Sequence, residues 1–467
     1  MRRVLREILI WIPFTALYGV TGVSFIILIP FLLLCFQVVL KGITRISVEQ
    51  IVKLVLFSSI IPNNYIPIAV VTFSALLFLV GKTTVKQTVF PPLLIIITGL
   101  YIIGNALASS SPWMNILFSC IYCCAIPASF YMFSHIEITA SLIEKIKDWL
   151  KGIIILQVVW LVFYSITHLS AILHEPDLDW VSGTFGYKQG NILFIVCAFA
   201  SIVFLYSYSR QRQISDLVFF IVSLVLAMST GSIGLCALYL MSFMIVMLLH
   251  PKIRIRHKVV AVLVPLISIA VIYVTNPSWV IQEIQSLSNF EAVTNRIEKL
   301  DMYRNVFITL PKEDFLFSLI GIGFGQGMSR AGMTCAGIYI SSYTNLFPTY
   351  SSQFMQEHVL QKLYVYLSGK GGMAQAPFSS IISIKTELGL VGLILLSIFF
   401  YYLFKKQHQP FGKLLVTFFV AILFWDNYLE YAKVMIVFAS AYYWCRFYNC
   451  NSIEKRLKNH VIEIKEV

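Results

Sequence analysis

The sequence predicts an all-α polytopic membrane protein, with about fourteen spans if each apolar tract crosses the bilayer once. Hydrophobic residues make up 58% of the 467 residues and charged residues only 12%, and the mean hydropathy is +0.81. A soluble domain carries about 25% charged residues, and a chain of this size cannot hide so much apolar surface in a water-soluble fold. The apolar residues gather in tracts, and the basic residues gather between them.

Each apolar tract is a candidate spanning helix, for which about 20 residues suffice. The tract 8–40 could form one long tilted helix, but Gly19 and Gly22 predict a hairpin. The tract 215–249 is too long for one span, and Ser229–Ser232 predicts a break in it. We expect at least twelve spans if both tracts are continuous. The expected spans are 8–20, 23–39, 48–61, 64–80, 88–107, 112–133, 151–172, 190–208, 215–230, 231–249, 258–275, 382–404, 412–426 and 432–447.

Lys and Arg mark the cytoplasmic loops of membrane proteins. With the spans above, every basic cluster falls on one side, which predicts that both termini are cytoplasmic. Two segments then lie outside, 173–189 and the long loop 276–381. The clusters are Arg2–Arg6, Lys41–Lys53, Lys82–Lys86, Lys145–Lys151, Arg210–Arg212, Lys252–Lys258, Lys405–Lys413 and Lys455–Lys458.

The expected organisation has four parts. Residues 1–275 form an N-terminal bundle of about eleven spans, residues 276–381 a large and partly helical outer loop, residues 382–447 the last three spans, and residues 448–467 a cytoplasmic tail. The net charge of +13 would suggest a nucleic-acid partner in a soluble protein. Here the positive-inside pattern explains it, so we expect no nucleic acid.

Chemistry is expected on the outer face, because the spans hold few ionisable residues and such residues mark ion pathways in carriers. The outer loop contains a helix-like stretch, 287–310, in which Arg296, Leu300 and Arg304 share one side. Guanidinium groups match phosphate oxygens, so these arginines are candidates for catalysis on a phosphorylated substrate. The alternative is a solvated face on which they pair with Glu298 or Asp301.

A glycine-rich stretch follows, with Gly321, Gly323 and Gly325 at alternate positions. Its backbone N–H groups could bind an anion, or the glycines could simply permit a tight turn. His358 is the one histidine of the loop and a candidate general base; the alternative is an ordinary surface histidine. The carboxylates Glu175, Asp177 and Asp179 of segment 173–189 are further candidate bases. We expect no metal site and no cofactor, because no histidine or carboxylate spacing typical of a metal site is present.

Four segments together resemble the O-antigen polymerase and ligase superfamily, which includes the Wzy-type polymerases. The first is Gly183–Asn191, similar to the family's Gly-x-Phe-x-x-x-Asn segment that leads into a span. The second, Met228–Gly234, lies where the family has a small-residue helix break. The third is the arginine helix followed by Gly-x-Gly, and the fourth is Phe378–Gly392, which ends Glu-x-Gly-x-x-Gly after the late outer loop.

The resemblance implies a metal-independent glycosyltransferase in the bacterial inner membrane. It would transfer a growing glycan from undecaprenyl diphosphate to the next lipid-linked repeat unit, at the outer face of that membrane. Arg296, Arg304 and His358 would then be catalytic. Lys188, Asn191 and the three glycines, Gly321, Gly323 and Gly325, would bind the lipid-linked oligosaccharide. Membrane lipid and a chain-length regulator protein are the partners that the resemblance suggests.

One departure favours the polymerase branch. Ligases of the superfamily carry His-Asn where this chain has Phe378 and Ser379. The alternatives that stay open are an O-antigen ligase and a flippase or transporter of lipid-linked oligosaccharides.

Overall fold

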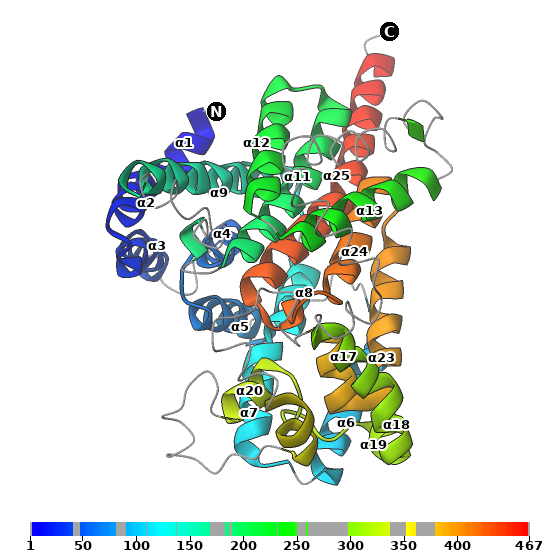
Figure 1. The fold of residues 1–467 in the computed structure, drawn as a ribbon. Coiled ribbons are helices and arrows are strands. Elements are labelled where there is room, and N and C mark those ends of the chain that lie inside the picture. The colour runs from blue at the N-terminus through cyan, green and yellow to red at the C-terminus, as the bar shows by residue number, and fades with distance from the viewer. Residues whose placement is uncertain are drawn as a thin grey trace.

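The structure is a computed structural model of the chain. It describes residues 2–40, 47–80, 90–109, 111–136, 138–168, 183–185, 189–230, 232–249, 258–259, 298–336, 352–360 and 379–465. Every regular element in these ranges is a helix (Figure 1), as the composition predicts. The predicted span 258–275 and the predicted outer segment 173–189 lie almost entirely outside the described residues.

The N-terminal helices follow the apolar tracts closely. They are α1 (Arg2–Ile8), α2 (Trp11–Thr21), η1 (Ser24–Ile27), α3 (Leu28–Leu40), α4 (Val48–Ser58), α5 (Tyr65–Val80), α6 (Pro92–Ala108), α7 (Trp113–Cys123), α8 (Ala125–His135), α9 (Ala140–Thr167), η4 (Gly183–Phe185), α11 (Gly190–Gln211), α12 (Ile214–Thr230) and α13 (Ile233–Leu249).

The C-terminal part combines short helices of the outer loop with long helices. They are α17 (Glu298–Arg304), η5 (Asn305–Thr309), α18 (Leu310–Glu313), α19 (Phe315–Ile320), α20 (Arg330–Cys335), η6 (Met355–Leu360), α23 (Ser380–Lys406), α24 (Pro410–Ile422), η9 (Tyr428–Glu430) and α25 (Ala432–Lys465). The described half of the predicted helix 287–310 is therefore helical, from Glu298 through α17, η5 and α18.

Several of these helices are long and apolar, and the chain is a multi-pass membrane protein. Among the described residues, α9, α11 and α23 meet the length and hydropathy of a full span, and α7 with α8 forms a fourth candidate bent by 44°. Six shorter apolar helices of 10–17 residues accompany them. Helix α9 begins earlier than the predicted span, because Thr139 caps it and the segment before Lys151 continues the helix.

Both tracts are broken in the structure, the first at Gly22 and not at Gly19, which lies inside α2. Helix α2 ends at Gly22, whose φ of 69° is the left-handed conformation that glycine adopts at a helix C-terminus. Helix α12 ends at Thr230 and α13 begins at Ile233. Residues that disfavour a continuous helix thus locate the boundary correctly at both positions.

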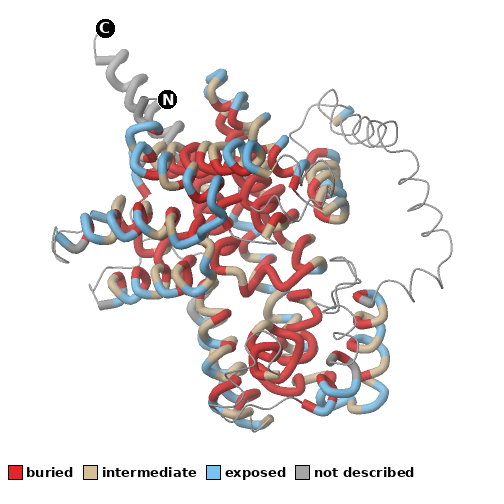
Figure 2. The backbone as a smooth tube through the Cα atoms, turned by 60° about the vertical axis from the view of Figure 1, so that its left-hand side comes forward, coloured by how far each residue is buried: buried red, intermediate tan, exposed pale blue. Residues whose placement is uncertain are grey.

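The core lies where α11, α24, α25 and α8 meet, while α3, α5 and α6 expose much apolar surface at the periphery (Figure 2). Aromatic rings fill the centre: Phe419 and Phe438 stack with centroids 4.0 Å apart. Apolar exposure at the periphery is the pattern expected of helices that face lipid.

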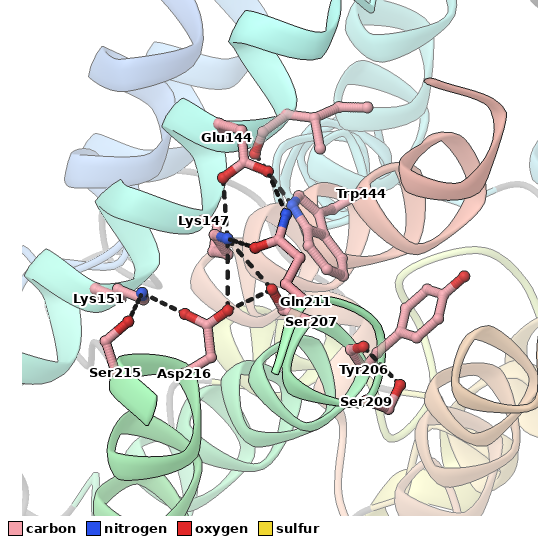
Figure 3. A network of polar contacts seen from close by, with 11 residues as sticks. Glu144, Lys147, Lys151, Tyr206, Ser207, Ser209, Gln211, Ser215, Asp216 and Trp444 are labelled. Atoms are coloured by element: carbon pink, nitrogen blue, oxygen red, sulfur yellow. Dashed lines mark hydrogen bonds and ion pairs between the residues drawn. The ribbon is translucent and has the colours of Figure 1, made fainter. Parts of the chain in front are cut away.

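Buried charge connects α9, α11 and α12 at one end of the bundle (Figure 3). Asp216 is fully buried and accepts from Lys151, Lys147 and Ser207. Glu144 pairs with Lys147 at 2.9 Å. The sequence predicts few ionisable residues in the spans. Two that do lie in predicted spans, Asp216 in 215–230 and Lys433 in 432–447, are fully buried.

Candidate functional site

The segments that carry the family resemblance are far apart in sequence but contact one structural feature, the turn between α24 and α25. We call residues 423–433 the central turn. Ser379 donates to the Leu423 carbonyl at 2.9 Å, and Ser383 donates to Asn427 at 2.8 Å. The side chain of Asn427 in turn donates to the carbonyl of Met328 in the glycine-rich loop, at 2.9 Å.

The glycine-rich loop folds around a carboxylate of the protein itself. Glu387 on α23 is buried, and its oxygens accept from the backbone N–H groups of Gly325 at 2.9 Å, Gly327 at 3.2 Å and Ser329 at 3.3 Å. The backbone N–H groups of the three predicted glycines donate within the protein, to Glu387 and Phe317. Their binding of a substrate stays a prediction.

A break in α23 makes this contact possible. Gly389 has φ 63° and ψ −162°, which interrupts the helix one turn after Thr386. The carbonyls of Thr386 and Glu387 then accept from Ile322 at 2.8 Å and Gly323 at 3.3 Å. A Cβ on Gly389 would stand 2.3 Å from the Leu319 carbonyl oxygen. The loop therefore inserts into the helix break, and its backbone N–H groups bond the carbonyls that the break leaves without helical partners.

Arg330 begins helix α20 directly after the loop, where Ser329 caps the helix by accepting from Gly332. Its backbone N–H donates to the Glu430 carboxylate, and its guanidinium lies over the Tyr431 ring, 3.6 Å from the centroid. The same guanidinium donates to the Tyr431 hydroxyl. This places an arginine, a carboxyl group and an aromatic ring in direct contact at the central turn.

Lys433 connects the first of the resembling segments to the central turn. Its ammonium group is fully buried and donates to the Phe185 carbonyl at 2.9 Å and to Gln189 Oε1 at 3.0 Å. Within the described residues it makes no ion pair. Two positions after Gln189, Asn191 accepts from the backbone N–H of Ser232 at 3.2 Å, so the first and second resembling segments also meet.

A second cation borders the central turn from the outer loop. Lys299 on α17 is buried, donates to the Trp425 carbonyl, and lies 4.9 Å from the centroid of the Trp425 ring. Tyr303, one turn later, bonds Ser379 at 2.7 Å and the Phe424 carbonyl at 2.9 Å. Ser379 thus anchors the helix that carries Arg304.

Burial shifts the proton affinities of the groups in the central turn. It raises the pKa of Glu430 to about 8, with a further contribution from the nearby charge of Glu387. It lowers the pKa of Lys299 to about 8, partly opposed by the nearby charge of Asp426. Glu430 therefore exchanges a proton close to neutral pH, which suits a general acid or base.

The predicted site residues fall into three groups. Arg296 and Lys188 lie outside the described residues, and His358 is placed only by its backbone, in η6. Arg304 is exposed on α17, on the same side as Leu300, as the spacing predicts. Asn191 and the glycines Gly321, Gly323 and Gly325 lie beside the central turn or in the loop that contacts it.

The most connected residues were not among the predicted site residues. Arg330 and Lys433 are single basic residues at the starts of helices, and neither belongs to a cluster in the sequence. One sequence pattern could have found Arg330: Ser329-Arg330 follows directly on the glycine-rich stretch, at a helix N-cap. Glu430 and Glu387 were visible as isolated carboxylates near the ends of spans, but their partners were not.

The arrangement offers a guanidinium for an anion, a carboxyl group that titrates near neutral pH, and tyrosines for a sugar ring. Besides Tyr431, Tyr122 bonds Tyr65 at 3.0 Å and Thr334 of α20 at 3.3 Å. Over the part of the chain that is described, no group of three His, Cys, Asp or Glu side chains could hold a metal ion. Comparison with models of known protein families, with curated proteins and with solved structures finds no match.

Proposed function

We propose that the protein is a polysaccharide polymerase of the membrane, transferring a growing glycan from undecaprenyl diphosphate to the next lipid-linked repeat unit. The observation that supports this best is the contact of Arg330 with Glu430 and Tyr431 at the turn where all four resembling segments converge. Glycosyl transfer from a lipid diphosphate needs these groups: a cation for the leaving diphosphate and a base for the acceptor hydroxyl.

In this reaction the acceptor hydroxyl attacks the anomeric carbon of the donor, and the bond from that carbon to the diphosphate oxygen breaks. Arg330 would stabilise the charge that develops on the departing diphosphate, as a preorganised donor in a partly buried site. Arg304 and Arg296 would bind the same group as it enters from the membrane surface, since guanidinium groups bind phosphate oxygens in a bidentate manner.

Glu430 is our candidate general base, in place of His358, Glu175 or Asp177. A base works best when its pKa is near the working pH, and burial raises the pKa of Glu430 to about 8. The proton of the acceptor hydroxyl would move to the Glu430 carboxylate as the new glycosidic bond forms. Tyr65 and Tyr431 would contact the sugar rings.

We further propose that this site faces the outer side of a bacterial inner membrane. The protein would cross that membrane about fourteen times, with both termini in the cytoplasm. Helix α1 and the C-terminal half of α25 lie at one end of the molecule, and α18, α19 and α20 lie at the opposite end (Figure 1). This arrangement agrees with the distribution of basic residues in the sequence.

The test uses a strain from which the gene has been deleted. A polymerase deletion leaves surface glycan capped by a single repeat unit, and the wild-type gene restores the polymer ladder. Arg330→Ala should fail to restore it, Arg330→Lys should restore it poorly because a point charge does not replace the fork, and the exposed Lys312→Ala should restore it fully. Accumulation of lipid-linked polymer in the deletion strain would identify a ligase instead.

A transporter of lipid-linked oligosaccharide is the second candidate, because the structure has features found in carriers. Lys433 is buried without an ion pair among the described residues, α23 is broken at Gly389, and α7 bends against α8. Broken helices and buried charges recur at transport sites. Purified protein in detergent separates the two: a polymerase extends lipid-linked repeat units without a bilayer, and a transporter leaves them unchanged.

A further inference from the structure

The outer loop carries a short helical hairpin, α18 to α19, whose surface is unusually apolar. Two consecutive residues of α19, Phe315 and Leu316, are 72% and 60% exposed. They are the centre of a larger set of exposed apolar side chains, which comprises Phe307, Ile308, Phe315, Leu316 and Phe317. A loop in water rarely exposes so many large apolar side chains side by side.

This apolar surface continues onto helices that the composition assigns to the bilayer. Helix α19 packs against α23, where Lys385 donates to the Ser318 carbonyl and Gly389 lies against Leu319. Only 28% of the apolar window of α23 is buried inside the protein, and α23 exposes Leu390 and Ile394. The Tyr101 hydroxyl of α6 donates to both the Ile320 and Leu388 carbonyls, at 2.9 and 2.7 Å, so α6 belongs to the same assembly.

The backbone of the hairpin is satisfied by the protein itself at both ends of α19. Asp314 caps the start of the helix by accepting from Phe317 at 3.0 Å. At the other end Gly321 donates to Phe317 at 2.7 Å, and Asn105 donates to the Ile320 carbonyl at 2.6 Å. Backbone groups that do not depend on water are what an element in contact with hydrocarbon requires.

The charges of the hairpin lie at its bend, directly before the first residue of α19. Lys312 and Glu313 are exposed, and Asp314 follows them. An element with an apolar side and a charged bend is suited to the boundary between lipid headgroups and acyl chains. The bend would stay among the headgroups while Phe315 and Leu316 reach the acyl chains.

We propose that α18 and α19 form an interfacial element whose partner is the lipid bilayer, with the exposed side of α19 against the acyl chains. The glycine-rich loop, which begins directly after α19, is then held just inside the membrane surface. The outer loop would then not face water over its whole length. The inference rests on the exposed apolar surface and on α23, and it holds whatever reaction the central turn supports.

The experiment is fluorescence quenching in vesicles. An environment-sensitive fluorescent amino acid is incorporated at Leu316 in one variant and at Gln353, an exposed polar position of the same outer loop, in the other. The full-length protein is reconstituted into phosphatidylcholine vesicles whose acyl chains carry bromine. We expect quenching at least threefold stronger at position 316 than at position 353. Equal, weak quenching at both positions would overturn the proposal.

A second measurement does not depend on the fluorophore being tolerated at position 316. Benzoylphenylalanine is close in shape to phenylalanine, so it replaces Phe315 with little change. Irradiation in vesicles that contain a radiolabelled phospholipid should give a covalent lipid adduct at position 315 and much less at position 353. Absence of the lipid adduct at position 315, in protein that elutes as a single symmetric peak in detergent, contradicts lipid contact.

Discussion

At Glu387 a single carboxylate holds three backbone N–H groups of the glycine-rich loop, and through Ser329 it fixes the start of the helix that carries Arg330. The geometry assigns Glu387 a positioning role, because its two carboxyl oxygens accept all three of these hydrogen bonds. The position of Arg330 and the fold of the glycine-rich loop therefore depend on Glu387, which lies two residues before the break in α23.

Glu387→Gln should disorder this loop. One carboxylate oxygen is replaced by an amide NH2 group, which cannot accept from a backbone N–H, so a buried donor is left unsatisfied at a cost of about 1–3 kcal/mol. We expect a lower unfolding temperature in detergent and loss of polymer in the deletion strain. Lys406→Gln, at the exposed end of the same helix, is the control and should leave both unchanged. Normal polymer from Glu387→Gln would contradict the role.

At Glu430 we expect the reaction rate to depend on pH. A carboxyl group whose pKa is about 8 is mostly protonated at pH 6 and mostly ionised at pH 9. As a general base it acts only when ionised, so the rate should rise with pH and level off above about 8. Glu430→Gln should remove this rise and lower the rate by about 10²-fold or more. A rate that falls through pH 8 would assign Glu430 as an acid instead.

The same shift has a consequence for stability. A Glu titrates near 4.3 when unfolded, and burial raises the pKa of Glu430 to about 8 in the folded protein. The folded state thus holds the proton more tightly between these values. Its stabilising contribution is complete below about pH 4 and is lost as the pH rises to about 8. Glu430→Gln, which stays neutral, should flatten the dependence of the unfolding temperature on pH in this range.

Among the elements, the broken helix α23 and the loop inserted into it depend on glycine at defined positions. Gly389→Ala should be severely destabilising, because φ is +63° there and a Cβ would stand 2.3 Å from the Leu319 carbonyl oxygen. Gly99→Ala is the matched control: it lies inside α6 with no atom within 4 Å of an added Cβ. Alanine there should stabilise the helix by up to about 1 kcal/mol. Thermal unfolding in detergent measures both, and equal effects would refute the account of the break.

Element boundaries were predictable where local residues decide them. Gly22 and the segment Ser229–Ser232 end helices in the structure as they do in the sequence interpretation. The break at Gly389 was missed, because Leu388 and Leu390 on either side of it continue the apolar tract. What decides it is the approach of the loop at Leu319 and Ile322, a contact between residues about seventy positions apart that no local pattern records.

The candidate site shows the same limit. The four resembling segments were visible as separate motifs, but the turn they share contains Asp426, Asn427 and Glu430, which form no motif of their own. Arg330 and Lys433 were missed because a single basic residue at a helix start has many possible roles. Their significance comes from burial and from their neighbours, which depend on tertiary packing.

For the whole molecule, buried charge at the end opposite the central turn should matter for folding. Asp216 is the carboxylate common to Lys147 and Lys151 (Figure 3). Asp216→Asn would leave the buried ammonium groups of Lys147 and Lys151 without their shared carboxylate. Of the described carboxylates, Glu144 still pairs with Lys147. Breaking a buried ion pair in this way costs about 3–5 kcal/mol. The control Glu49→Gln affects a partly exposed pair with Lys145 and should cost about 1 kcal/mol or less. Unfolding in detergent distinguishes the two, and similar small losses would show that the network is not needed.

The orientation of the whole molecule can be tested with reporters that are active on one side of the membrane only. The positive-inside pattern predicts that both termini are cytoplasmic and that the outer loop lies on the other side. A phosphatase, active only outside the cytoplasm, should be active when fused after Lys312, at the exposed bend of the hairpin, and inactive after Lys406 at the end of α23. A fluorescent protein that folds only in the cytoplasm should give the reverse pattern. The two positions lie at opposite ends of the assembly of α19 with α23, so one span separates them whatever the total number of spans. Activity of the cytoplasmic reporter at Lys312 would show that the protein has the opposite orientation in the membrane. The central turn would then face the side where undecaprenyl-linked units are built, and the proposed polymerase would be ruled out.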